Sequence, residues 1–201
     1  MSDASVTVAI LAGGQGRRLG GVDKGLQIVS GKPLIAHVCV AVEAMHAPKN
    51  AHGDRDVLIL ANRNLQRYST YARTLPDDID SGKGPLAGIA TTLSAMSTPW
   101  LLTVPVDCPY PPLDLWRRLQ SAIGDADCAV SHDGMHRQPL FALYRLGLAP
   151  SAKKAAKAGL GPQAWQDQID TVDIDFDDQR ENFANLNSAA DFDAYGNVAD
   201  E

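Results

Sequence analysis

A glycine-rich run directly follows the first apolar segment of the chain. The apolar residues 6–11 predict a buried strand, and Gly13, Gly14 and Gly16 come immediately after it. Glycine allows the backbone to adopt positive φ and to approach a ligand closely, because no Cβ is in the way. Backbone amides presented in this manner bind anions. The run therefore predicts a strand followed by a phosphate-binding loop.

Basic residues follow the glycines, namely Arg17, Arg18 and Lys24. Cations beside such a loop suit a ligand with several negative charges, such as a triphosphate. The run matches neither common phosphate motif, because Leu19 stands where a G-x-G-x-x-G fingerprint needs glycine and the sequence G-x-x-x-x-G-K-[ST] is absent. The competing interpretation is a glycine-rich turn with solvated arginines.

Strand-like and helix-like segments alternate along the chain. The predicted strands cover residues 6–11, 57–61, 101–106, 128–130 and 140–144. The predicted helices cover residues 33–45, 65–72, 85–96, 112–123 and 149–161. Three of these helices are expected to begin at proline, which is favoured at the first helical position. The alternation predicts right-handed crossovers and an α/β fold, a three-layer α/β/α sandwich with a mostly parallel sheet.

Asp107 is the strongest single candidate for a functional carboxylate. It directly follows the apolar segment 101–106, and the ligands of such folds bind at the carboxyl ends of the strands, where the glycine run also lies. A hard oxygen ligand at this place suits Mg²⁺. The alternative role is a cap for the helix expected at Pro112, although Asp114 lies closer to it.

Composition excludes several classes of protein. The chain has 201 residues and a net charge of −6, so it lacks the basic field that nonspecific nucleic-acid binding needs, and one domain spanning residues 1–201 is expected. Its three cysteines are widely spaced, which argues against a disulfide framework or a zinc site and favours a reducing cytoplasm. Neither an export signal nor a membrane-spanning segment is apparent, so we expect a cytoplasmic protein.

Residues 11–24 read L-A-G-G-Q-G-R-R-L-G-G-V-D-K. This segment resembles the N-terminal signature of the MobA-type molybdenum cofactor guanylyltransferases, which belong to the nucleotidyltransferase superfamily. Four further segments agree with that family in the same order, at residues 84–89, 106–110, 132–139 and 185–188. The resemblance covers nearly the whole chain and implies a Rossmann-like nucleotidyltransferase fold.

The resemblance implies transfer of GMP from GTP to the terminal phosphate of Mo-molybdopterin, with pyrophosphate as the second product and Mg²⁺ as the cofactor. It assigns catalytic roles to Arg18, Lys24 and Asp107, with Asp107 as the metal ligand. The nucleotide-binding residues that it implies are Leu11, Ala12, Gly13, Gly14, Lys24, Asp77 and Asp107. The N-terminal half would bind the nucleotide and the C-terminal half the acceptor. Molybdoenzymes or their chaperones would be further partners; nucleic acid and membranes would not.

Recognition of guanine points to Asp77. A carboxylate can accept hydrogen bonds from both N1–H and the N2 amino group of guanine. Asp77 lies seven residues before Gly84, which is the family's spacing, and Asp78 is its rival. Leu60 departs from the family, which tends to have an asparagine there. Asn62 keeps the second amide, either in a turn or at the ligand.

The acceptor side is predicted in the C-terminal half. Asn185 and Asn187 resemble the family's Asn-x-Asn pair, whose side chains point the same way on an extended backbone. Asn187 could equally cap a helix that begins at Ser188. The family's arginines are missing from residues 159–168. The acceptor phosphate would then fall to one of three lysines, Lys153, Lys154 or Lys157.

Two other functions remain open at this point. A cytidylyltransferase for the same pterin, or a sugar-phosphate nucleotidylyltransferase, would use the same loop and Asp107 with a different base pocket. A noncatalytic protein that binds nucleotide and delivers cofactor is the second alternative. The presence of Arg18, Lys24 and Asp107 argues against it, because a carrier does not need a magnesium carboxylate at the α-phosphate.

Overall fold

The computed structural model describes residues 5–13, 23–49, 53–78, 84–186 and 191. Within these residues, a seven-stranded sheet has the strand order β5-β4-β1-β6-β8-β7-β9, and β2 and β3 form a separate pair. The strands of the large sheet are β1 (Val6–Leu11), β4 (Asp56–Leu60), β5 (Arg73–Leu75), β6 (Trp100–Pro105), β7 (Cys128–His132), β8 (Arg137–Arg145) and β9 (Thr171–Asp175). The small pair consists of β2 (Ile28–Val29) and β3 (Lys32–Pro33).

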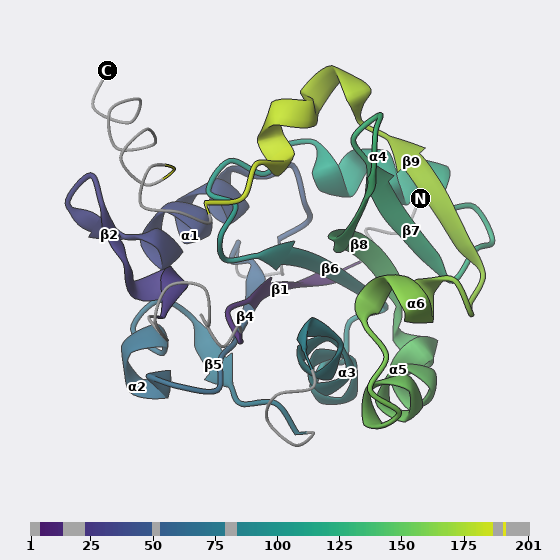
Figure 1. Cartoon of the computed structure of the whole chain (residues 1–201), viewed down its shortest axis with the longest axis horizontal. Coiled ribbons are helices and arrows are strands. Elements are labelled where there is room, and N and C mark those ends of the chain that lie inside the picture. The colour runs from purple at the N-terminus through teal and green to yellow at the C-terminus, as the bar shows by residue number, and fades with distance from the viewer. Residues whose placement is uncertain (1–4, 14–22, 50–52, 79–83, 187–190, 192–201) are drawn as a thin grey trace.

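Helices cover both faces of the large sheet (Figure 1). Helices α1 (Leu34–Ala44) and α4 (Leu115–Ala122) pack on one face, and α3 (Pro85–Ala95), α5 (Ala149–Lys157) and α6 (Pro162–Gln166) pack on the other. The remaining helical segments are α2 (Leu65–Tyr68) and the short 3-10 helices η2 (Lys24–Leu26), η3 (Leu146–Leu148) and η4 (Asp177–Phe183). The expected three-layer α/β/α sandwich is therefore confirmed.

The sheet is mostly parallel, as expected. Strands β5, β4, β1 and β6 run in the same direction, and Leu11 pairs with Leu60 on one side and with Pro105 on the other. Strand β8 is antiparallel to both β6 and β7, and β9 is parallel to β7. The carboxyl ends of β4, β1 and β6 consequently meet at one edge of the sheet, which we call the rim.

The central strands are buried on both sides because their sequences are apolar nearly throughout. All six residues of β1 are buried. Ile10 belongs to the cluster beneath α1 and α4, together with Val38 and Leu119. Ala9 belongs to the opposite cluster beneath α3, together with Ile89. Alternate residues of one strand thus supply two separate cores.

Several element boundaries differ from the sequence prediction. Helix α3 begins at Pro85 as expected, but α1 begins at Leu34, because Pro33 has an extended backbone with ψ 145°. Helix α4 begins at Leu115, three residues beyond Pro112. Proline fits the first turn but equally fits the extended residue before it, so the residue type alone did not fix the start. The pair β2–β3 and the edge strands β5 and β9 were not predicted.

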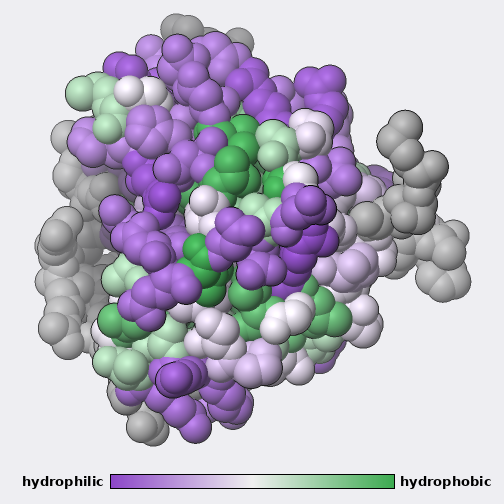
Figure 2. Space-filling model, turned by 90° about the vertical axis from the view of Figure 1, so that its right-hand side faces the viewer, coloured by the Kyte–Doolittle hydropathy of each residue, from purple (hydrophilic) through white to green (hydrophobic). Residues whose placement is uncertain are grey.

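Strand β9 forms one edge of the sheet, and its surroundings are strongly charged. Figure 2 shows that hydrophilic residues cover most of this side of the molecule. Asp173 and Asp175 of β9 are exposed, and Arg137 of β8 lies 2.7 Å from Asp173 and 2.6 Å from Asp167. Charged side chains on an edge strand oppose pairing with another chain.

In the part of the chain that the structure describes, no helix has the length and apolar character needed to cross a membrane.

Candidate active site

The rim brings together the ends of three strands. The backbone N–H of Ala12 donates to the carbonyl of Leu60 at 2.8 Å, and that of Val106 donates to the carbonyl of Leu11 at 3.1 Å. Leu11 and Ala12 are buried, whereas Gly13 is exposed. Of the predicted nucleotide-binding residues 11–13, Gly13 is therefore the first to reach the surface. It does so near the turn that carries Asp107.

Lys24 and Asp107 lie in direct contact at this rim. The Nζ atom of Lys24 donates to Oδ2 of Asp107 at 3.0 Å, and their side chains are 21% and 23% exposed. Asp107 lies in a turn after β6, and the residue before α4 is Asp114, so Asp107 does not cap that helix. Two candidates from distant parts of the sequence are thus brought together, in a partly buried place where charges interact more strongly than in water.

Asp77 lies beside the start of the glycine run. A Cβ on Gly13 would lie 3.7 Å from Oδ2 of Asp77 and 3.4 Å from Nδ2 of Asn62. Asn62 and Asp77 bind each other twice: Nδ2 of Asn62 donates to Oδ2 of Asp77 at 2.6 Å, and the N–H of Asp77 donates to Oδ1 of Asn62 at 2.9 Å. Burial raises the pKa of the Asp77 carboxyl, and the hydrogen bond from Asn62 offsets this only in part.

Its rival, Asp78, is placed differently. The side chain of Asp78 is exposed and lies 2.7 Å from Nζ of Lys153 on α5. Hydrogen bonding by Lys153, followed by its charge, lowers the pKa of Asp78. Of the two aspartates, Asp77 is therefore the one whose carboxylate lies near Gly13. Lys153, a candidate for the acceptor phosphate, pairs with Asp78 instead.

The segment after η4 returns to Asp107. The N–H of Leu186 donates to the carbonyl of Asp107 at 2.8 Å, and Sγ of Cys108 donates to the carbonyl of Asn182 at 3.0 Å. Asn185, which is exposed, therefore lies next to the turn that carries Asp107. Its predicted partner Asn187 lies outside the described residues. So do two residues predicted to hold phosphate, Gly14 and Arg18.

A buried carboxylate organises the loop after β7. Asp133 is 7% exposed and accepts hydrogen bonds from the N–H groups of Met135 at 2.8 Å and His136 at 2.7 Å. Nε2 of Gln138 donates to its other oxygen at 2.6 Å. Burial raises the pKa of Asp133, but these hydrogen bonds outweigh burial and hold the pKa below its usual value. The ring of His132 is also engaged, because its Nδ1 accepts from the N–H of Gly134 at 3.1 Å.

The carboxylates near the rim suit one kind of metal site and not another. Among the described residues, no group of three or more His, Cys, Asp or Glu side chains could hold a metal. Mg²⁺ does not need one, because it keeps several waters and takes one or two carboxylates together with substrate phosphates. Asp107 supplies one partly exposed carboxylate just after the end of β6, at the rim where β1 also ends. This arrangement is suitable for Mg²⁺ but not for a metal ion whose ligands must all come from the protein.

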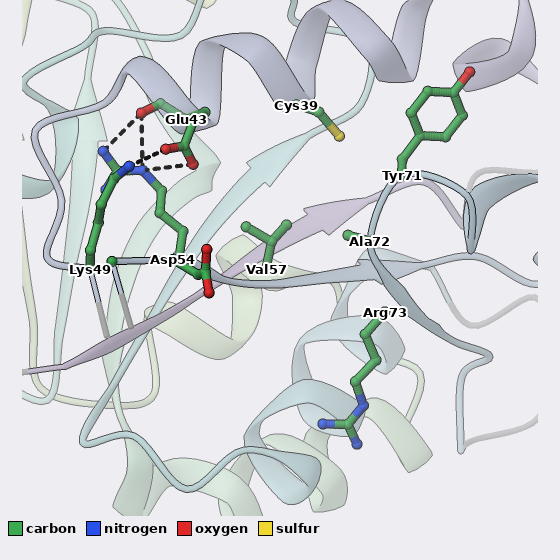
Figure 3. Close-up of a pocket in the computed structure, with 10 residues that line it drawn as sticks. Cys39, Glu43, Lys49, Asp54, Val57, Tyr71, Ala72 and Arg73 are labelled. Atoms are coloured by element: carbon green, nitrogen blue, oxygen red, sulfur yellow. Dashed lines mark hydrogen bonds and ion pairs between the residues drawn. The ribbon is translucent and has the colours of Figure 1, made fainter. Parts of the chain in front are cut away.

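A cavity of about 450 Å³ lies at the amino ends of β4 and β5, away from the rim, and between these strands and α1 (Figure 3). Arg55 there donates to the carbonyls of Glu43, Met45 and Ala47, which lie at the end of α1 and just after it. Lys49 pairs with Glu43 above the cavity, as the dashed lines show. These charges complete the end of a helix, so the cavity belongs to the scaffold and is separate from the rim.

Sequence reasoning left the partner of Asp77 open and missed the partners of Asp23. The sequence leaves Asn62 as either a turn or a ligand residue, and its role as the partner of Asp77 depends on β4 and β5 lying side by side. Asp23 accepts hydrogen bonds from Tyr68 and from Asn64. Residues that contact one another across 41 or more positions leave no local pattern in a sequence.

Residues 8–172 match the MobA-like NTP transferase domain. The chain is 37% identical to a molybdenum cofactor guanylyltransferase of Pasteurella multocida, covering 92% of this chain and 96% of that protein. It is 39% identical to one of Shewanella pealeana, covering 92% and 90%.

The fold has a solved counterpart in molybdopterin-guanine dinucleotide biosynthesis protein A from Archaeoglobus fulgidus. The TM-score is 0.77 and the identity 21%, with 96% of this chain and 98% of that chain covered. At this identity the likeness supports the fold alone. The family match and the sequence relatives support more: the chain belongs to the MobA-like NTP transferases, in the family of the molybdenum cofactor guanylyltransferases, and is an enzyme of the nucleotidyltransferase class.

Proposed function

We propose that this enzyme transfers GMP from GTP to the terminal phosphate of Mo-molybdopterin, releasing pyrophosphate. The observation that carries the proposal is the pairing of Lys24 with Asp107 at the rim, beside the start of the glycine run. A cation and a candidate metal ligand at the carboxyl ends of the strands would suit a bound triphosphate. The sequence relatives named as guanylyltransferases support the choice of reaction.

The reaction needs positioning and neutralisation of charge rather than a covalent intermediate. The acceptor phosphate attacks the α-phosphorus in line, a new P–O bond forms, and the bond to the leaving pyrophosphate breaks. A phosphate monoester, whose second pKa is about 6, is mostly deprotonated near neutral pH, so no general base is required. Lys24 would neutralise the negative charge that develops on the α-phosphoryl oxygens.

Phosphate and metal binding follow from the same residues. Amides of Gly13 and Gly14, together with Arg18, would hold the β- and γ-phosphates. Asp107 would hold Mg²⁺, which supplies Lewis-acid stabilisation of phosphate charge when bound. Because Lys24 contacts Asp107, its ammonium group would lie within reach of both the carboxylate that holds the metal and the α-phosphate.

Specificity for guanine would depend on Asp77. The carboxylate of Asp77 accepts a hydrogen bond from Nδ2 of Asn62, and the N–H of Asp77 donates to Oδ1 of Asn62, which holds the side chain near Gly13. Leu60 is buried against the α3 side and offers no side-chain hydrogen bond, so the base contact falls to Asp77. On the acceptor side, Asn185 and Asn187 would bind the pterin, in the C-terminal half of a single domain. Molybdoenzymes or their chaperones would receive the product, and the dispersed cysteines favour the cytoplasm.

One assay tests the reaction and its alternatives together. Purified enzyme is supplied with Mg²⁺, molybdopterin and one of GTP, CTP or ATP, and release of pyrophosphate is measured alongside the dinucleotide product. Pyrophosphate released only with GTP and only with molybdopterin present supports the proposal. A preference for CTP would identify a cytidylyltransferase. Binding of GTP without any turnover would identify a cofactor carrier instead.

A further inference from the structure

Asp23, the residue before Lys24, is held by hydrogen bonds from helix α2 and from Asn64, which directly precedes that helix. The carboxylate of Asp23 accepts a hydrogen bond from the hydroxyl of Tyr68 at its Oδ1. It accepts another from Nδ2 of Asn64 at 2.9 Å at its Oδ2. Asn64 is the residue before α2 and Tyr68 is its last residue. Both carboxylate oxygens of Asp23 are therefore held by one short element far away in the sequence.

The residue after Lys24 is held from the same side. Gly25 is buried, and a Cβ added to it would overlap the hydroxyl of Tyr68 and lie 2.9 Å from Cγ2 of Val106. Val106 directly precedes Asp107. The backbone around Lys24 thus lies between Tyr68 and the turn that carries Asp107, and glycine is needed because no side chain fits between them.

The two donors are themselves specialised for this contact. Tyr68 is fully buried, and burial, then hydrogen bonding to Asp23, raises its pKa, so the hydroxyl stays protonated and remains a donor. Asn64 has φ 52°, a left-handed conformation that is uncommon outside glycine and for which asparagine is enriched. Such a conformation persists only where surrounding contacts support it. The bond from its amide to Asp23 is such a contact.

We propose that Tyr68 and Asn64 are positioning residues for catalysis, which act through Asp23 to hold the ammonium group of Lys24 beside Asp107. A lysine side chain has four flexible carbons and loses rotamer entropy when it is fixed. Fixing the backbone on both sides of it reduces the number of places that the ammonium group reaches. The inference rests on the proposed role of Lys24 at the α-phosphate and adds the residues that control it.

The test uses substitutions that remove single polar groups. Tyr68→Phe removes the hydroxyl and keeps the ring, and Asn64→Gly removes the amide and keeps the left-handed backbone accessible. Tyr71→Phe is the matched control, because this tyrosine is 38% exposed and lines the cavity beside α1, away from the rim. We expect Tyr68→Phe to lower kcat about tenfold, the size of one strong hydrogen bond, with little change in KM for GTP. Tyr71→Phe should behave as the wild type.

A double substitution separates positioning from a general loss of structure. If Tyr68 acts through Lys24, Tyr68→Phe should lower kcat in the wild-type background and have no further effect in Lys24→Ala. An equal loss in both backgrounds would show that the hydroxyl supports the fold at large, and the proposal would be wrong. An unchanged kcat in Tyr68→Phe and Asn64→Gly would overturn it as well.

A second readout does not depend on turnover. In competitive acetylation of the folded protein, Lys24 should react slowly because it is held against Asp107, and exposed Lys32 serves as the reference. Tyr68→Phe should raise the relative labelling of Lys24 several-fold, whereas Tyr71→Phe should not. If the wild type transfers no guanylyl group, the proposed function fails while this measurement still tests the contact. Labelling of Lys24 that Tyr68→Phe leaves unchanged would overturn the inference.

Discussion

Nζ of Lys24 lies 3.0 Å from Oδ2 of Asp107, although 83 positions separate the two residues in the sequence. The contact arises because β1 and β6 are parallel neighbours, so the segments that follow them begin at the same edge. Both side chains are mostly shielded from solvent, which makes each charge dependent on the other. A single substitution at either position therefore changes the electrostatics of the whole site.

Replacement of Asp107 by alanine is expected to abolish most Mg²⁺-dependent transfer while the fold survives. Loss of a group that holds charge in the transition state typically costs about 3 kcal/mol, or more than a hundredfold in kcat. Steady-state rates over a range of Mg²⁺ concentrations measure the effect, and circular dichroism checks the fold. Asp178→Ala is the control, because that aspartate is exposed and pairs with Arg118. Near-normal turnover of folded Asp107→Ala would remove Asp107 from the metal site.

Replacement of Lys24 by alanine should lower kcat more than it raises KM for GTP. The reason is that Lys24 is assigned to charge that develops only in the transition state, and such contacts affect kcat rather than ground-state binding. The comparison requires kcat and KM for the variant and for Lys32→Ala, an exposed lysine. A raised KM with unchanged kcat would mean that Lys24 only anchors the ground-state phosphate.

The elements that sequence reasoning placed correctly are those whose pattern is local. The apolar run at β1 has the observed bounds, Val6–Leu11, and the position of Asp107 after an apolar strand correctly placed it at the rim, where β1 also ends. The family resemblance is confirmed by the family match and the relatives. These features could be predicted because strand burial and chain order act over a few neighbouring residues.

Long-range contacts could not be predicted in the same way. Strand β5 has three residues and β9 carries two exposed aspartates, so neither shows the apolar pattern of a strand. Both form because a neighbouring strand offers backbone hydrogen bonds, which a sequence does not display. The choice between Asp77 and Asp78 likewise depended on where Asn62 and Lys153 lie in space.

The buried carboxylate of Asp133 should stabilise the protein in a pH-dependent manner. Its pKa is lowered in the folded state, so its contribution is present above the unfolded value of about 3.9 and is lost as pH falls through the folded value. Asp133→Asn should lower the free energy of unfolding by about 1–3 kcal/mol at pH 7, because an amide group replaces the oxygen that accepts from Nε2 of Gln138 and the backbone donors lose a charged acceptor. Urea denaturation at several pH values measures this difference.

The difference between wild type and Asp133→Asn should shrink as pH falls below about 3.9, because the unfolded carboxyl takes up a proton there before the folded one does. Asp125→Asn is the control, since Asp125 is exposed. A difference that stays constant down to acid pH would show that the shape of the side chain, and not its charge, fixes the loop.

Asp77→Asn should make the enzyme less selective and the fold more stable at neutral pH. The pKa of Asp77 is raised by burial, so the charged carboxylate is disfavoured in the folded state once pH exceeds the unfolded value. Asparagine removes that penalty, and its oxygen can still accept from Asn62. The gain in unfolding free energy should be present at pH 7 and vanish as pH falls below the unfolded value of about 3.9, where the wild-type carboxyl becomes protonated in both states.

Selectivity for GTP over the other nucleotides should fall in Asp77→Asn, although the stability of the fold rises. If Asp77 accepts from N1–H and N2 of guanine, the amide of Asp77→Asn leaves one donor facing another, which costs about 1–3 kcal/mol. Preference for GTP should then fall roughly ten- to a hundredfold at about 1.4 kcal/mol per decade, while CTP and ATP, which lack that donor pair, lose little. Competition between the three triphosphates measures the ratio of kcat/KM. A parallel loss with all three would mean that Asp77 binds a part that every nucleotide shares, such as the ribose, and base recognition would then move to backbone groups near Gly84.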